Sequence, residues 1–77
     1  MIQPGSVVRF SKMPEWVAGL PDESRRVFEF CFGRIYRIEE IDTQGLLVLD
    51  VGADVDGRFG GFNNDLRLEA EFLEEIV

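Results

Sequence analysis

Apolar and charged residues alternate in the middle of the chain, in the segment G-R-I-Y-R-I-E-E-I that begins at residue 33. In an extended strand, Tyr36 and Ile38 would share one face, and mostly charged residues would share the other. Ile41 breaks this alternation, and a β-bulge at Glu39-Glu40, or a strand that leaves the sheet there, would return it to the core. Residues 42–45, D-T-Q-G, predict a tight turn, because Asp bonds the backbone ahead of it and Gly adopts a positive φ angle.

The segment after this turn, L-L-V-L-D-V at residues 46–51, is apolar on both faces except for Asp50. Leu46 and Val48 alternate with the other aliphatic residues, and the pattern leaves open which set faces the core. A strand with aliphatic residues on both faces needs another part of the structure to cover each face. A helix could supply the second cover, or the same strand of a second subunit could do so about a two-fold axis. A homodimer centred on this hairpin is therefore one expectation.

The first part of the chain predicts a strand followed by a long connection. Residues 7–10, V-V-R-F, predict a short strand with Val8 and Phe10 facing the core. Residues 15–18 then predict a single helical turn that Gly19 ends. Trp16 lies in this connection, where an aromatic ring either closes over the end of a small barrel or serves in binding.

Residues 21–32, P-D-E-S-R-R-V-F-E-F-C-F, predict a helix in the loop after the first strand. Pro21 suits the first turn, the acidic residues that follow suit the positive end of the helix dipole, and Gly33 is a typical stop. The stretch 28–32 also alternates as a strand would, and the end signals decide for the helix. Near-helical spacing predicts that the core side holds Leu20, Ser24, Val27, Phe28 and Cys31.

The last third of the chain predicts short elements. Asp56-Gly57 favours a turn, followed by a short strand at residues 58–62. The acidic residues before Gly57 suggest a calcium loop, but Gly52 and Asn63 would then stand at ligand positions that require carboxylates. Residues 66–69, L-R-L-E, predict a strand with both leucines inward, and residues 70–73 predict a helical turn before a closing segment.

The composition limits which classes of protein this chain can belong to. Seventy-seven residues predict one domain, 1–77, with a thin core. One cysteine and no histidine exclude an internal disulfide and leave no recognisable zinc site and no nucleophile with its base. We therefore expect no enzyme, no cofactor and no metal. We expect a soluble cytoplasmic protein, of bacterial type, that does not enter a membrane. The reasons are the lone cysteine, the absence of signal-peptide features, and a longest apolar run of only Leu46–Leu49.

The net charge is −7, from fifteen acidic and eight basic residues. Residues 1–37 carry six bases and four acids, whereas residues 38–77 carry two bases and eleven acids. Such a field repels nucleic acid and anionic membranes overall and keeps a protein soluble. Nucleic acid is therefore not the partner that we expect first.

Together these elements predict a mainly β fold, a small partly open antiparallel β-barrel of four or five strands with one short helix in the loop after the first strand. The order of elements resembles the Src-homology-3-like small barrels, including the bacterial and KOW-type versions. The resemblance lies in G-S-V-V-R-F, in G-R-I-Y-R-I-E-E-I-D-T-Q-G-L-L-V-L-D-V and in N-D-L-R-L-E-A-E-F-L-E-E-I, where such barrels often close with a helical turn and a final strand. A helix in the 20–31 loop is an elaboration of such barrels. The A-L-Y-D-Y-like opening of the peptide-binding members is missing, so recognition of proline-rich peptides is not implied.

These observations favour a small acidic protein-interaction or self-assembling module without catalytic activity, whose protein partner the sequence does not identify. One alternative is a nucleic-acid-binding barrel that uses a local patch of arginines and aromatic residues. Another is an acidic mimic of nucleic acid that binds a basic protein. The candidate interaction residues are Trp16, Arg25, Arg26, Tyr36, Leu46, Val48, Arg58 and Phe59.

Overall fold

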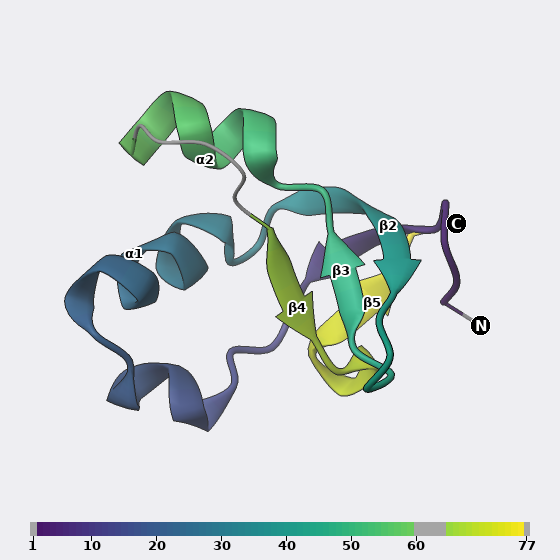
Figure 1. Ribbon diagram of the computed structural model, residues 1–77, viewed down its shortest axis with the longest axis horizontal. Coiled ribbons are helices and arrows are strands. Elements are labelled where there is room, and N and C mark those ends of the chain that lie inside the picture. The colour runs from purple at the N-terminus through teal and green to yellow at the C-terminus, as the bar shows by residue number, and fades with distance from the viewer. Residues whose placement is uncertain (1, 60–64, 77) are drawn as a thin grey trace.

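The computed structural model describes residues 2–59 and 65–76, with the side chains of residues 53, 54, 56 and 59 left out. Strands, one-turn 3-10 helices (η) and α-helices follow one another along the chain (Figure 1). Their order is β1 (Val7–Phe10), η1 (Glu15–Gly19), α1 (Asp22–Cys31), β2 (Ile35–Ile41), β3 (Leu47–Leu49), α2 (Gly52–Phe59), β4 (Leu66–Leu68), η2 (Ala70–Phe72) and β5 (Leu73–Glu75).

The strands form one antiparallel sheet of five in the order β4-β3-β2-β1-β5, which curls into a half-barrel (Figure 1). This confirms the predicted mainly β, partly open antiparallel barrel with a helix after the first strand. The helical turn and the closing segment predicted after β4 are η2 and β5. Strand β5 pairs with β1 in the register Phe10↔Leu73, and beyond it the Ile76 N–H donates to the Val7 carbonyl at 2.8 Å.

The β2–β3 hairpin has the predicted bulge and turn. The register shifts between Ile38 and Glu40, and Gly45 has a φ angle of 82°. Because Ile41 pairs directly with Leu47, the bulge does return it to the core face of the sheet. Ile41 nevertheless lies at the end of the strand and is 44% exposed. The expectation that it joins the core is therefore wrong, because a residue on the core face is not buried when it stands last in its strand.

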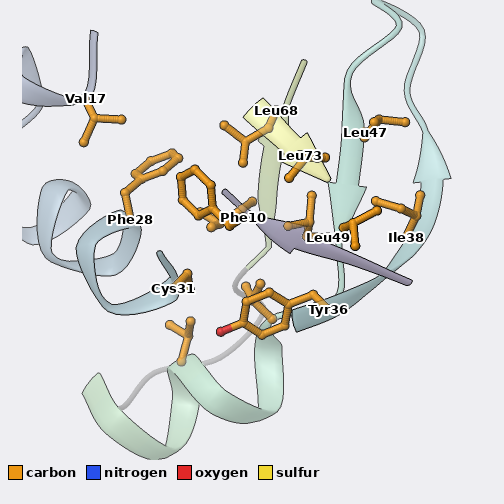
Figure 2. Packing of buried hydrophobic residues seen from close by; sticks show 14 residues of the cluster. Phe10, Val17, Phe28, Cys31, Tyr36, Ile38, Leu47, Leu49, Leu68 and Leu73 are labelled. Atoms are coloured by element: carbon orange, nitrogen blue, oxygen red, sulfur yellow. The ribbon is translucent and has the colours of Figure 1, made fainter. Parts of the chain in front are cut away.

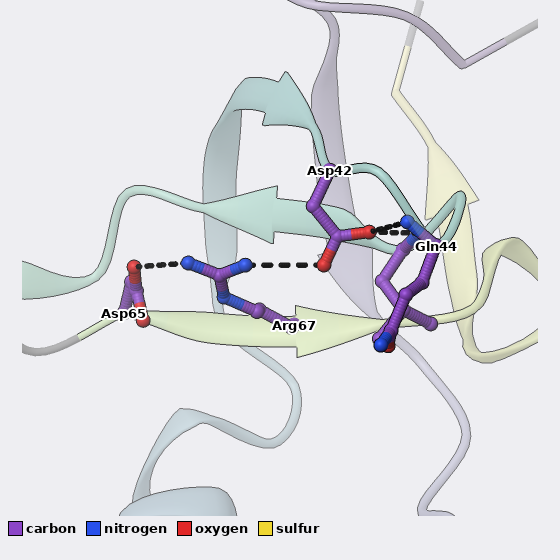
Figure 3. Close-up of polar contacts among 5 residues, drawn as sticks. Asp42, Gln44, Asp65 and Arg67 are labelled. Atoms are coloured by element: carbon purple, nitrogen blue, oxygen red, sulfur yellow. Dashed lines mark hydrogen bonds and ion pairs between the residues drawn. The ribbon is translucent and has the colours of Figure 1, made fainter.

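Strand β3 is buried on both faces. Leu47 and Leu49 belong to the hydrophobic core, whereas Val48 points to the other face, opposite Glu40 and Arg67 in the neighbouring strands. All three residues of β3 are at most 4% exposed. Arg67 of β4 donates a hydrogen bond to the carboxylate of Asp42, which follows β2, at 3.1 Å (Figure 3). One chain therefore supplies both covers that this strand needs.

The predicted helix is confirmed as α1, with Gly33 beyond its end at a φ angle of 82°. Phe28 and Cys31 are buried, and Leu20 and Val27 pack against the core. Ser24 is exposed, so its predicted place on the core side is wrong. The rings of Phe10 and Phe28 meet edge to face with centroids 6.3 Å apart, which joins α1 to the sheet (Figure 2).

The prediction for the start of the last third of the chain is wrong, because the structure has helix α2 there. Residues 52–59 are helical, where we expected a turn at Asp56-Gly57 and a strand from residue 58; residues 60–62 lie outside the described part. Val51 and Val55 are each 1% exposed, and the Val55 N–H donates to the Val51 carbonyl at 2.9 Å. Burial of this pair, four positions apart, outweighs the poor helix propensity of Gly57.

Candidate interaction surface

The end of α1 is fixed to the sheet by backbone hydrogen bonds. The Gly33 N–H donates to the Phe10 carbonyl at 2.8 Å, and the Phe10 N–H donates to the Arg34 carbonyl at 3.1 Å. These bonds place the last turn of α1 and the residue after the helix stop at one defined position. The exposed side chains of this turn therefore project from a backbone that is fixed to the sheet.

Phe30 and Arg34 form a stacked pair at this end of α1. The guanidinium carbon of Arg34 lies 4.1 Å from the centroid of the Phe30 ring. The Arg34 Nε–H also donates to the Phe30 carbonyl at 3.0 Å. Phe30 is half-buried and packs against the core, so it holds the arginine at a fixed place on the surface.

An open cleft of about 550 Å³ lies between α1 and α2. Among the described residues, it is lined by Arg26, Glu29 and Phe30 of α1 and by Arg58 from the last turn of α2. Both helices lie to one side of the half-barrel (Figure 1). We call this the α1–α2 cleft. It collects arginines that are far apart in the sequence.

The α1–α2 cleft brings basic residues together on an acidic protein. Arg26, Arg58 and Phe30 line it together with Glu29, and Arg34 stacks on the Phe30 ring. Glu29 lies 3.8 Å from the Arg25 guanidinium, which offsets part of its charge. The net charge of the protein is −7, whereas the described lining of this cleft holds two arginines and one glutamate. Arginine guanidinium groups of this kind bind carboxylates or phosphates through paired hydrogen bonds.

A second depression, of about 290 Å³, lies on the other flank of α1. We call it the η1–α1 groove. Trp16 stands beside it in η1, 44% exposed, with its ring edge to face against Phe28 at 5.4 Å between centroids. The described lining is mostly apolar, with charged residues at the α1 side: Met13, Pro14, Glu15, Val17, Ala18, Arg25 and Glu29.

The hairpin end of the sheet carries a polar network of another kind. Asp42 Oδ1 accepts hydrogen bonds from the Gln44 and Leu46 N–H groups at 2.8 and 2.9 Å, and Asp42 Oδ2 accepts one from Arg67 at 3.1 Å (Figure 3). The Leu46 N–H is the main cause that lowers the pKa of Asp42 below its usual value, helped by Gln44 and Arg67. Arg67 also lies 3.7 Å from Asp65. These groups hold the turn and β4 together.

The predicted interaction residues fall into two groups. Arg26 and Arg58 meet in the α1–α2 cleft, while Trp16 and Arg25 lie at the η1–α1 groove, where Arg25 also pairs with Asp22 at 2.7 Å. The remaining candidates lie elsewhere: Tyr36 and Val48 are buried (6% and 1% exposed), Leu46 is half-buried, and the side chain of Phe59 is outside the described part.

Tyr36 belongs to the hydrophobic core, and Val48 is buried on the opposite face of the sheet. The alternation that placed Tyr36 beside Ile38 already indicated this for Tyr36. Sequence reasoning missed Phe30 and Glu29 as lining residues. The spacing of Arg26 and Phe30, four positions apart on one helix face, is the signal that would have found the first of them.

Within the described residues, no group of three or more His, Cys, Asp or Glu side chains is placed to hold a metal ion. A search of the same residues finds no helix with the length and apolar character needed to span a membrane. In comparisons with protein-family models, curated proteins and solved structures, no match to this chain was found.

Proposed function

We propose that this chain is a small protein-interaction module without catalytic activity, and that its partner binds at the α1–α2 cleft. The observation that carries the proposal is the meeting of Arg26 and Arg58, from two separate helices, beside the ring of Phe30. Arginine with an aromatic residue is the pair that contributes most often to binding hot spots. The lone cysteine supports a reducing cytoplasm as its place of action.

The element order supports the resemblance to the Src-homology-3-like small barrels. Strand β5 follows the helical turn η2 and pairs with β1, the closing arrangement that the resemblance implied. On this proposal α1 and α2 are additions to the barrel, one between β1 and β2 and the other between β3 and β4. The α1–α2 cleft is then a surface that this chain builds from its own additions.

Self-association through the β2–β3 hairpin is no longer part of the proposal. The homodimer expected from the sequence needed an uncovered apolar face on β3, and Leu47, Val48 and Leu49 are all covered within one chain. The acidic mimic has less support as well. Glu74 pairs with Arg9 at 3.3 Å, and Glu75 accepts a hydrogen bond from the Ser6 hydroxyl at 3.4 Å, so part of the acidic run is bound within the domain.

An array of short peptides of acidic, basic and neutral composition tests the proposal at about 150 mM salt. We expect the acidic peptides to retain the protein and Arg26→Glu to abolish retention. Arg37→Glu is the matched control, because Arg37 is an exposed arginine on β2 that is not among the described lining of the cleft. Retention that ignores peptide charge, or that survives Arg26→Glu, would contradict the proposal.

Nucleic-acid binding is the second candidate, and the same arginines favour it. Phosphate contacts supply most of such affinity, and the net charge of −7 opposes them. We therefore expect weak or no binding of labelled single- and double-stranded DNA and RNA at about 150 mM salt. Micromolar affinity that is lost in Arg26→Glu and kept in Arg37→Glu would favour nucleic acid over protein as the partner.

A further inference from the structure

The α1–α2 cleft and the η1–α1 groove lie on adjacent flanks of one helix and share Glu29. Arg25 and Glu29 are four positions apart and face the groove, while Arg26 and Phe30 are four positions apart and face the cleft. Residues one position apart differ by about 100° around a helix, so these two rows are neighbours on the surface of α1. The depressions therefore adjoin across the exposed face of α1.

The two depressions differ in chemistry. The η1–α1 groove is lined by the half-buried Met13 and the exposed Ala18 beside the buried Pro14 and Val17, with Trp16 at its border, in a space at the lower limit for a ligand site. The α1–α2 cleft offers arginines for carboxylates. A single chemical group would not suit both, whereas a chain with an apolar and an acidic residue would.

We infer that the two depressions form one bipartite site for an extended acidic peptide segment of the partner. This inference rests on the proposed function and names its ligand class. One apolar side chain occupies the η1–α1 groove, and one or two carboxylates pair with Arg26 and Arg58 in the α1–α2 cleft. The chemistry of the lining selects this occupant, because the guanidinium groups of Arg26 and Arg58 bind carboxylates and the groove is lined mostly by apolar side chains.

The geometry of α1 sets the spacing within the peptide. A helix with its side chains is about 10 Å across, and an extended chain advances about 3.3 Å per residue. The apolar residue and the first acidic residue should therefore be about three positions apart. Glu29, at the boundary, offers carboxylate oxygens to the N–H groups of the peptide that crosses it.

The test uses the full-length ¹⁵N-labelled chain and the acetylated probe peptide Glu-Glu-Ser-Gly-Leu-Ser, together with its reversed sequence. We expect one of the two directions to shift the amide signals of both residues 15–18 and residues 26–30. Replacing the probe leucine by serine should weaken binding about tenfold and abolish the shifts at 15–18 alone. Replacing both probe glutamates by glutamine should abolish binding.

Ala18→Asp places a carboxylate in the η1–α1 groove at an exposed position, and Ala70→Asp in η2 makes the same change at another exposed alanine. Ala18→Asp should weaken the parent peptide and leave the serine peptide unchanged, while Ala70→Asp should affect neither. Equal affinity of the leucine and serine peptides, with shifts confined to the cleft, would overturn the bipartite site and leave the proposed function standing. No binding by any acidic probe would overturn both.

Discussion

The hairpin end of the sheet and its helical side use the same kinds of residue in opposite ways. At the hairpin end, Arg67 lies between Asp42 and Asp65 and forms ion pairs with both (Figure 3). On the helical side, Arg26 and Arg58 line an open cleft. Arg67 is held between two acids of its own sheet, whereas Arg26 and Arg58 line an open space beside Phe30. Three pairs of variants test what stabilises each region.

The largest effect should come from a charge placed on the buried strand of the hairpin end. Val48→Glu buries a carboxylate at a site 1% exposed, which should unfold the chain or cost at least about 3 kcal/mol. Ile41→Glu, at a neighbouring site that is 44% exposed, is the control and should cost less than about 1 kcal/mol. Urea unfolding followed by circular dichroism measures both.

Light scattering on the same samples adds a second test of this strand. If the mass of the wild type is twice 8.8 kDa and Val48→Glu halves it without unfolding, β3 is an interface and the internal cover described above is incomplete. We expect the wild type to remain at the mass of one chain over a hundredfold range of concentration.

A smaller effect should follow from the turn itself. Gly45 has a φ angle of 82°, and a Cβ atom there would meet nothing within 4 Å, so Gly45→Ala isolates the backbone strain of about 1–2 kcal/mol. Gly19 in η1 also has open space but no positive φ angle. Gly19→Ala should be neutral or stabilise by up to about 1 kcal/mol. Urea unfolding measures both changes. If the two substitutions lowered the free energy of unfolding equally, the positive φ angle of Gly45 would not explain the cost.

The smallest effect should come from the charge of Asp42, and it depends on pH. Folding lowers the pKa of Asp42, so the charged form stabilises the folded state above the ordinary pKa of 3.8. This stability is lost as the pH falls through the lower pKa of the folded state. Asp42→Asn keeps an oxygen for the Leu46 N–H and removes the charge. At pH 7 the free energy of unfolding of Asp42→Asn should therefore be lower than that of the wild type. This difference, the deficit of the variant, should shrink as the pH falls below the ordinary pKa of Asp.

Urea unfolding of the wild type and Asp42→Asn at pH values from 7 to about 2 measures this deficit. Asp65→Asn is the companion variant, because Asp65 also faces Arg67 but at 3.7 Å and with a more exposed side chain. Its deficit at pH 7 should be smaller than that of Asp42→Asn. A deficit of Asp42→Asn that stays constant across the titration would show that its charge does not stabilise the turn.

The sequence predicted the elements whose signals are local. The turn at residues 42–45, the bulge before it and the helix from Asp22 to Cys31 follow from hydrogen-bonding side chains, alternation and end signals. Helix α2 was missed because Asp56-Gly57 has the local signature of a turn, and only the tertiary burial of Val51 and Val55 decides for a helix. The cleft was missed with it, since Arg58 lines the cleft from the last turn of this helix.

The return of β5 to β1 has a consequence for how the domain folds. Arg9 and Glu74 are 65 positions apart in the sequence and yet join neighbouring strands. Such contacts close a long loop, and closing a long loop costs more chain entropy than local pairing does. Contacts of this kind therefore form late and slow the folding of the domain. The β2–β3 hairpin can form early, but β1 gains its second neighbour only when residues 73–76 arrive. During synthesis on the ribosome, the sheet therefore cannot be completed until almost the whole described chain has emerged.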